Sequence, residues 1–153
     1  MATETSPLAE VEEDLRALIK SAGTLRREAE DARKQGDEAA KKILLEVIAV
    51  ADAFENVLRN AEAGGAAEEP KCRAALNSVR TVQKMLVRAL KSSEAVAMEI
   101  LVGDKANPHW HNVVEVEANI GLETGTITEV IKKGYLWRGK LLRAAEVKAV
   151  RNR

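Results

Sequence analysis

The opening third of the chain carries a narrow apolar stripe with the spacing of a coiled coil. Its apolar and small residues alternate at steps of three and four: Leu8, Val11, Leu15, Leu18, Ala22, Leu25, Ala29, Ala32, Gly36, Ala39 and Ile43. The positions between them are mostly charged or polar. A helix with so narrow a stripe cannot bury it against itself. The pattern therefore predicts a long paired coiled-coil helix over residues 9–43, preceded by a disordered terminus over residues 1–8.

The middle of this seam is built from small residues, including Ala32 and Gly36. Two interpretations stay open. Small side chains let two helix backbones approach closely, which is a packing role. Alternatively, a glycine that costs about 1 kcal/mol relative to alanine inside a helix makes a segment that melts before the rest, as in a thermosensor.

The composition narrows the class of protein. The 24 basic and 24 acidic residues give a formal net charge of zero, so no global field points to nucleic acid. Cys72 is the single cysteine, which excludes a disulfide within one chain. No apolar run reaches the roughly 18 residues that a membrane span needs. With no secretory signal in the first residues, we expect a cytoplasmic protein with no membrane partner.

The apolar pattern widens after Ile43 and predicts a helical bundle over residues 44–93. The first helix is expected to end at Ala63-Gly64-Gly65, and Pro70 to begin a second helix that stops at Ser92-Ser93, with an exposed loop over residues 66–69. Two amphipathic helices in each chain would form a four-helix bundle in a dimer.

Residues 94–153 read as a small β head with glycine at most corners. Alternation from Val96 to Val102 predicts a first strand. Further strands are expected over 113–117 and 126–131, with Val113 and Val114 in the core. A final hairpin or meander is expected over 135–150. The fold class is therefore α+β: a coiled-coil helix, a dimeric helical bundle and a C-terminal all-β head.

The residues give little support to an enzyme or to a cofactor. His109 and His111 flank Trp110, and two histidines without a third ligand make a poor zinc site. Asp52 and Glu55 lie three residues apart and could be paired carboxylates, although capping, solvation or a salt bridge explains them better. We expect no catalytic residue, no metal and no cofactor.

Three sequence motifs carry a specific resemblance. The run Gly103-Asp104-Lys105-Ala106-Asn107-Pro108-His109-Trp110-His111-Asn112-Val113-Val114 resembles the signature of the GrpE family. The pair Gly134-Tyr135, followed by Lys140-Leu141-Leu142-Arg143-Ala144-Ala145-Glu146-Val147, is similar to that family's ending. The helical segment from Leu44 to Leu58 also resembles a family segment. The chain departs from the signature at Ala106 and Asn107, where the family has Phe-Asp, although Asn107 can still form an Asx turn before Pro108.

The resemblance implies a nucleotide exchange factor for DnaK-type heat-shock chaperones. In that family two chains pair through long helices, and a β head holds the chaperone's ATPase domain open so that ADP leaves. Such a homodimer acts by binding and makes no covalent bond. The alternative is a passive homodimeric coiled-coil adaptor whose head tethers another partner without affecting nucleotide.

The resemblance also suggests roles for individual residues. Expected chaperone contacts are Lys140, Arg143, Arg26 and Arg27, and Arg143 has a second interpretation as a structural salt bridge within the head. Residues expected to maintain the fold of the head are Gly103, Asn107, Pro108, His111, Gly134 and Tyr135. The pattern places Leu15, Leu18, Leu25, Ile43, Leu44 and Ile48 on the dimer seam.

Overall fold

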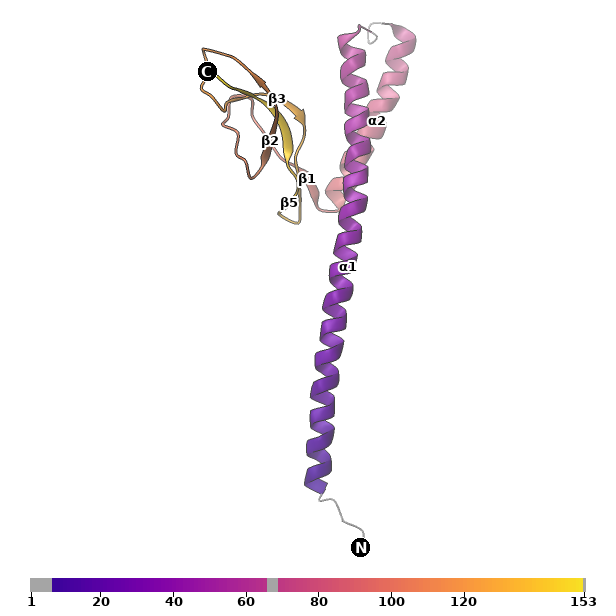
Figure 1. Ribbon diagram of the computed structural model, residues 1–153. Coiled ribbons are helices and arrows are strands. Elements are labelled where there is room, and N and C mark those ends of the chain that lie inside the picture. Colours follow the sequence, from indigo (N-terminus) through magenta and orange to yellow (C-terminus); the bar gives the residue numbers. More distant parts are fainter. Residues whose placement is uncertain (1–6, 66–68, 153) are drawn as a thin grey trace. The chain divides into compact units, whose positions relative to one another are not determined.

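The computed structural model describes residues 7–65 and 69–152 (Figure 1). The chain divides into two compact units at Lys41/Lys42. The expected loop residues 66–68 and the terminal residues 1–6 lie outside this part of the chain. Residues 7 and 8, which the sequence assigned to a disordered terminus, are already helical. Neither described helix contains a stretch apolar enough to cross a membrane.

Helix α1 (Pro7–Ala63) runs without a break for 57 residues, a length of about 85 Å at 1.5 Å per residue. No proline interrupts it after its first residue, and acidic Glu10 stands in the first turn, where it favours the helix dipole. In the first unit the seam is fully open to solvent in a single chain. Leu15, Leu18 and Leu25 are 55%, 67% and 62% exposed.

The second unit contains the end of α1 and helix α2 (Pro70–Ser92), as the sequence predicted. The N–H of Gly64 donates to the carbonyl of Asn60 at 2.9 Å, and Gly65 takes a left-handed φ of +71° that ends α1. At the other end of α2, the N–H of Ser93 bonds back into the last helical turn. The side chains of Arg80 and Glu62 pair between the two helices.

The apolar face of these helices is partly buried within the chain itself. Leu44 is 8% exposed and Ile48 is 0% exposed, so this single chain already covers two of the six residues assigned to the dimer seam. Ile43, by contrast, remains 65% exposed. The other buried residues of this core are Ala51 and Leu58 on α1 and Leu76 and Leu90 on α2.

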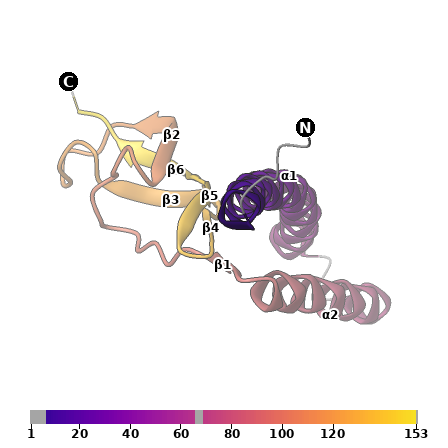
Figure 2. The ribbon, with the colours of Figure 1, turned by 90° about the horizontal axis from the view of Figure 1, so that it is seen from below.

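The head begins with a three-stranded antiparallel sheet in the order β1-β4-β5 (Figure 2). Its strands are β1 (Ala95–Ala97), β4 (Tyr135–Trp137) and β5 (Lys140–Arg143). The expected first strand is wrong beyond Ala97, because Met98 and Ile100 leave the ladder and pack against the core of the second sheet. Alternating side chains alone did not distinguish this irregular, half-buried segment from a strand.

The second sheet has the order β2-β6-β3, with β2 (His111–Glu117), β3 (Ile127–Lys132) and β6 (Ala145–Val150). The expectation of a final hairpin is confirmed for β4–β5. It is wrong for β6, which runs parallel to β2 and antiparallel to β3 (Figure 2). A buried cluster of Ile127, Ala145 and Val147 forms the core, and Ala106 packs against it.

Strand β2 lies at the edge of this sheet and is largely exposed. Val113 and Val114, expected in the core, are 42% and 45% exposed, so that expectation is wrong. The pairing of β2 with β6 shifts register between Val113 and Glu115, which leaves Val114 without a paired residue. An apolar residue in a strand need not face the core when the strand forms an edge.

Candidate functional site

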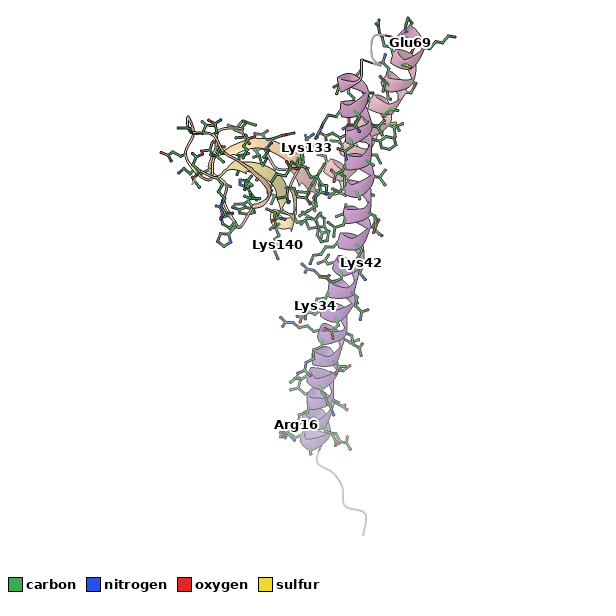
Figure 3. The ribbon with its side chains drawn as sticks, turned by 45° about the horizontal axis from the view of Figure 1, so that its top comes forward. Arg16, Lys34, Lys42, Glu69, Lys133 and Lys140 are labelled. Atoms are coloured by element: carbon green, nitrogen blue, oxygen red, sulfur yellow. The ribbon has the colours of Figure 1, made fainter. Side chains whose placement is uncertain are left out.

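The β4–β5 hairpin presents a lysine on a tight turn. Arg138 and Gly139 form the two-residue connection with φ of +49° and +74°, as in a type I′ turn. Lys140 follows directly and pairs across the hairpin with Trp137. Its side chain is exposed (Figure 3). Among the residues that the structure describes, no acidic group forms an ion pair with Lys140, so its charge is available to a partner.

The hairpin is attached to the end of α2. The indole Nε1–H of Trp137 donates to the carbonyl of Ser93 at 3.1 Å, and the backbone N–H of Arg138 donates to the carbonyl of Glu94 at 3.1 Å. The Arg138 side chain pairs with the Glu94 carboxylate at 3.0 Å and lies 4.6 Å from the centre of the Trp137 ring. Glu94 takes a left-handed φ of +62°, which redirects the chain from α2 into β1.

The other end of the hairpin is attached to α1. Arg143 makes a two-point contact with the Asp52 carboxylate, at 2.5 Å from Nη1 and 3.1 Å from Nη2, and donates to the carbonyl of Lys133 at 2.6 Å. The side chains of Arg143 and Asp52 are only 22% and 14% exposed. Arg143 therefore forms a salt bridge, but with a residue of α1 and not within the head, where the sequence analysis had expected it.

Two neighbours complete this attachment. Lys133, labelled in Figure 3, pairs with Glu55 at 2.9 Å. Asp52 and Glu55 thus both form salt bridges, one of the ordinary roles expected for them. The guanidinium of Arg143 lies 5.5 Å from the centre of the Tyr135 ring. Burial raises the pKa of the Tyr135 hydroxyl, and the charge of Asp52 raises it further, whereas Arg143 opposes the shift.

A small cleft opens between α1 and β3. It has a volume of about 60 Å³ and is lined by Asp52, Glu55, Asn56, Arg59 and residues 130–133. Ligand pockets usually measure about 300–1,000 Å³, so this cleft is too small for a nucleotide. Across residues 7–65 and 69–152, no three metal-ligating side chains come together.

The signature loop folds as the motif requires. The Asn107 side chain accepts a hydrogen bond from the N–H of His109 at 3.0 Å, which confirms the Asx turn. The N–H of Trp110 donates to the carbonyl of Asn107 at 3.0 Å, with Pro108 at the second position, where its fixed φ suits a turn. His111 accepts from the N–H of Asn107 through Nδ1 at 3.0 Å.

Two glycines of the motifs occupy positions that a side chain would disturb. Gly103 has a φ of +105° and donates its N–H to the carbonyl of Ile127 at 2.8 Å. A Cβ on Gly134 would lie 2.0 Å from Cε of Met98 and 2.8 Å from the backbone nitrogen of Ala145. Tyr135, next to it, is 4% exposed. These residues hold the head together at the points where its segments cross.

The two candidate arginines on α1 lie in the first unit. Both are exposed, and Arg26 pairs with Glu30 one turn along the helix at 3.2 Å. An exposed pair at this spacing is worth only about 0.3–0.5 kcal/mol, so it leaves Arg26 able to bind elsewhere.

The sequence analysis did not single out Ser93, Glu94 or Trp137 as residues that hold the hairpin in place. The Arg138-Gly139 turn was the signal that could have pointed to them. A hairpin turn is presented rigidly only when the residues beside it are held in place.

Comparison with known proteins agrees with these features. The family model described as GrpE matches residues 3–151. Two relatives named Protein GrpE, from Francisella philomiragia and Francisella tularensis subsp. tularensis, are each 33% identical over 129 residues. These alignments cover 82% of this chain but 61% and 60% of the two relatives, so the chain spans about three fifths of their length. The match over nearly the whole chain, together with the folded signature loop, shows that the chain belongs to the GrpE family.

Proposed function

We propose that this chain is a homodimeric nucleotide exchange factor that binds the ATPase domain of a DnaK-type chaperone and promotes ADP release. The observation that carries the proposal is the family match over residues 3–151. The exposed seam of α1 and the uncompensated lysine on the β4–β5 hairpin are consistent with it. The factor is proposed to act in protein folding and the heat-shock response of the cytoplasm, as a binding protein and not as an enzyme.

Nucleotide exchange by this route depends on the difference between the factor's affinities for the open and the closed ATPase domain. The factor binds the open ATPase domain more tightly than the closed one, so it shifts the partner towards the open state. Each tenfold loss of ADP affinity requires about 1.4 kcal/mol of that difference. The coupling is reciprocal, so nucleotide binding to the chaperone should in turn weaken its affinity for the factor.

We assign the main contact to Lys140, because its charge is exposed on a fixed hairpin. Arg26 and Arg27 are proposed to add contacts from the helix. Arg143 is bound to Asp52 and mostly buried, so we assign it the support of the hairpin and not the principal contact. A lysine presents a single compact charge, which suits an exposed carboxylate of the partner better than a two-point fork.

The homodimer is proposed from the exposed apolar residues of α1. Leu15, Leu18, Leu25 and Ile43 remain between 55% and 67% exposed in a single chain. A paired helix would bury them, at about 25 cal/mol per Å² of apolar surface. Sedimentation equilibrium should therefore give twice the mass of the chain, and Leu18→Asp with Leu25→Asp should shift the protein towards monomer. A wild-type monomer at micromolar concentration would contradict the dimer.

The test of function is the release of labelled ADP from the chaperone with and without this protein. Wild type should accelerate release at micromolar concentration, and Lys140→Ala should need more protein for the same rate. Lys71→Ala, an exposed lysine on α2, is the matched control and should behave as wild type. If wild type binds the chaperone without accelerating release, the protein is an adaptor, and the exchange proposal fails.

A further inference from the structure

Two ion pairs join the head to α1 at neighbouring points. Asp52 binds Arg143, and Glu55 binds Lys133 at 2.9 Å. We propose that these four residues form a latch that fixes the orientation of the head on α1 and so presents Lys140 to the partner. The inference rests on the proposed function for its consequence, but the latch itself can be tested without a chaperone.

The Asp52–Arg143 pair has the geometry of a positioning contact. A two-point contact between guanidinium and carboxylate restricts direction as well as distance. The third bond, from Nη2 of Arg143 to the carbonyl of Lys133 at 2.6 Å, ties the same guanidinium to the end of β3. Its Nε is buried without a hydrogen-bond partner. The guanidinium is therefore oriented by Asp52 and Lys133, at the cost of leaving one donor unsatisfied.

The second ion pair prevents a rotation of the head that the first pair alone would allow. Asp52 and Glu55 are three residues apart and lie on one face of the helix. A single contact would let the head turn about that point, whereas two contacts along the helix axis oppose rotation. Both acceptors are on α1, and both donors, Lys133 and Arg143, are on the head. In both ion pairs, therefore, α1 carries the negative charge and the head carries the positive charge.

The latch is directly connected to the proposed contact residue. Lys140 and Arg143 are the first and last residues of β5, so the strand that carries the exposed lysine ends in the latch. The opposite end of the hairpin is held by the bonds of Trp137 and Arg138 to Ser93 and Glu94. With one end fixed to α2 and the other to α1, the hairpin cannot tilt without breaking one attachment.

A loosened latch should reduce affinity through the population of competent orientations. If only a tenth of the molecules present Lys140 correctly, the apparent dissociation constant rises about tenfold. Saturating concentrations recover the correct orientation, so the limiting exchange rate stays near the wild-type value. A latch mutation should therefore change the half-saturating concentration and not the limiting rate.

The first experiment measures the orientation of the head alone. Spin labels at Asn60→Cys on α1 and Glu129→Cys on β3, in a Cys72→Ser background, report the distance between helix and head. Labelled chain is diluted into excess unlabelled chain so that only distances within one chain are seen. Asp52→Asn should broaden the distribution of distances. Asp52→Glu should keep it nearly as narrow as in wild type, and Glu123→Gln should leave it unchanged. Glu123→Gln is the matched control because it removes an ion pair to Lys105 inside the head.

The second experiment measures ADP release against protein concentration. Asp52→Asn should raise the half-saturating concentration about tenfold with the limiting rate within about twofold, while Asp52→Glu and Glu123→Gln stay close to wild type. Tryptophan fluorescence confirms that each variant is folded at the assay temperature. An unchanged distance distribution in Asp52→Asn would overturn the latch, as would an equal kinetic effect of Glu123→Gln. If wild type itself gives no exchange, the proposed function fails, and the label distances still decide whether the latch orients the head.

Discussion

Adding one methyl group at Gly134 should destabilise the head. The new Cβ would lie 2.0 Å from Cε of Met98, 2.8 Å from the nitrogen of Ala145 and 3.2 Å from its Cβ. Met98 can swing its flexible end aside. The backbone of Ala145 cannot, because its N–H is bonded to the carbonyl of Trp110 at 2.9 Å and its side chain belongs to the buried cluster.

The magnitude follows from the cost of overpacking. Forcing an extra methyl into a packed interior costs about 1–3 kcal/mol. The Met98 clash is relieved by rotation, but the backbone clash is not, so we expect about 2 kcal/mol from Gly134→Ala. The same substitution at Gly23, which has nothing within 4 Å of a new Cβ, should instead stabilise its helix by about 1 kcal/mol.

Unfolding of the head and unfolding of the helices can be followed separately. Both tryptophans, Trp110 and Trp137, lie in residues 94–153, so their fluorescence reports unfolding of the head, while far-ultraviolet circular dichroism is dominated by the helices. Urea titrations of Gly134→Ala should move the fluorescence midpoint down, and those of Gly23→Ala should move the helical midpoint up. A fluorescence midpoint unchanged by Gly134→Ala would show that the backbone contact yields easily and would refute the steric argument.

Three further predictions concern the seam, the hairpin turn and the acid limit of stability. Gly36→Ala should raise the midpoint of any early helical melting step seen by circular dichroism, and a fall would indicate that two chains pack closely at Gly36. Gly139→Ala should cost the head about 1–2 kcal/mol in urea, because its φ of +74° is left-handed, and Gly139→Asn should cost less. The hydrogen bond from Lys148 holds the pKa of Glu117 below its usual 4.5. That stabilisation is present above pH 4.5 and is lost as the pH falls through the lowered value. The difference in urea midpoint between wild type and Glu117→Gln should therefore shrink in acid, and a constant difference would contradict the linkage.

Local signals predicted the helices and the signature loop well. Proline at Pro70 and glycine at Gly64 act on the backbone within one turn, so the helix ends could be placed from the sequence. Asn107 before Pro108 similarly dictates its own turn. These features depend on neighbours a few residues away, which the sequence displays directly.

Long-range pairings could not be predicted in the same way. The pattern that placed Val113 and Val114 in the core records only that they are apolar, and whether β2 is central or an edge depends on where β6 inserts. The salt bridge between Asp52 and Arg143 joins residues 91 positions apart, so no periodic pattern in the sequence reveals it. The sequence offered a salt bridge as one role for each residue, and the fold supplied the partner.

The central place of β6 has a consequence for the order of events during synthesis. Strands β2 and β3 each pair with β6, so neither has its neighbour until the ribosome has passed Val150. At about 5–20 residues per second, the 33 residues after Glu117 take roughly 2–7 s to appear. During that interval the valines of β2 and its unpaired backbone are open to other nascent chains. Strand β2 is thus most vulnerable before β6 has been synthesised, and rapid translation of residues 118–150 should favour a high yield of folded chain.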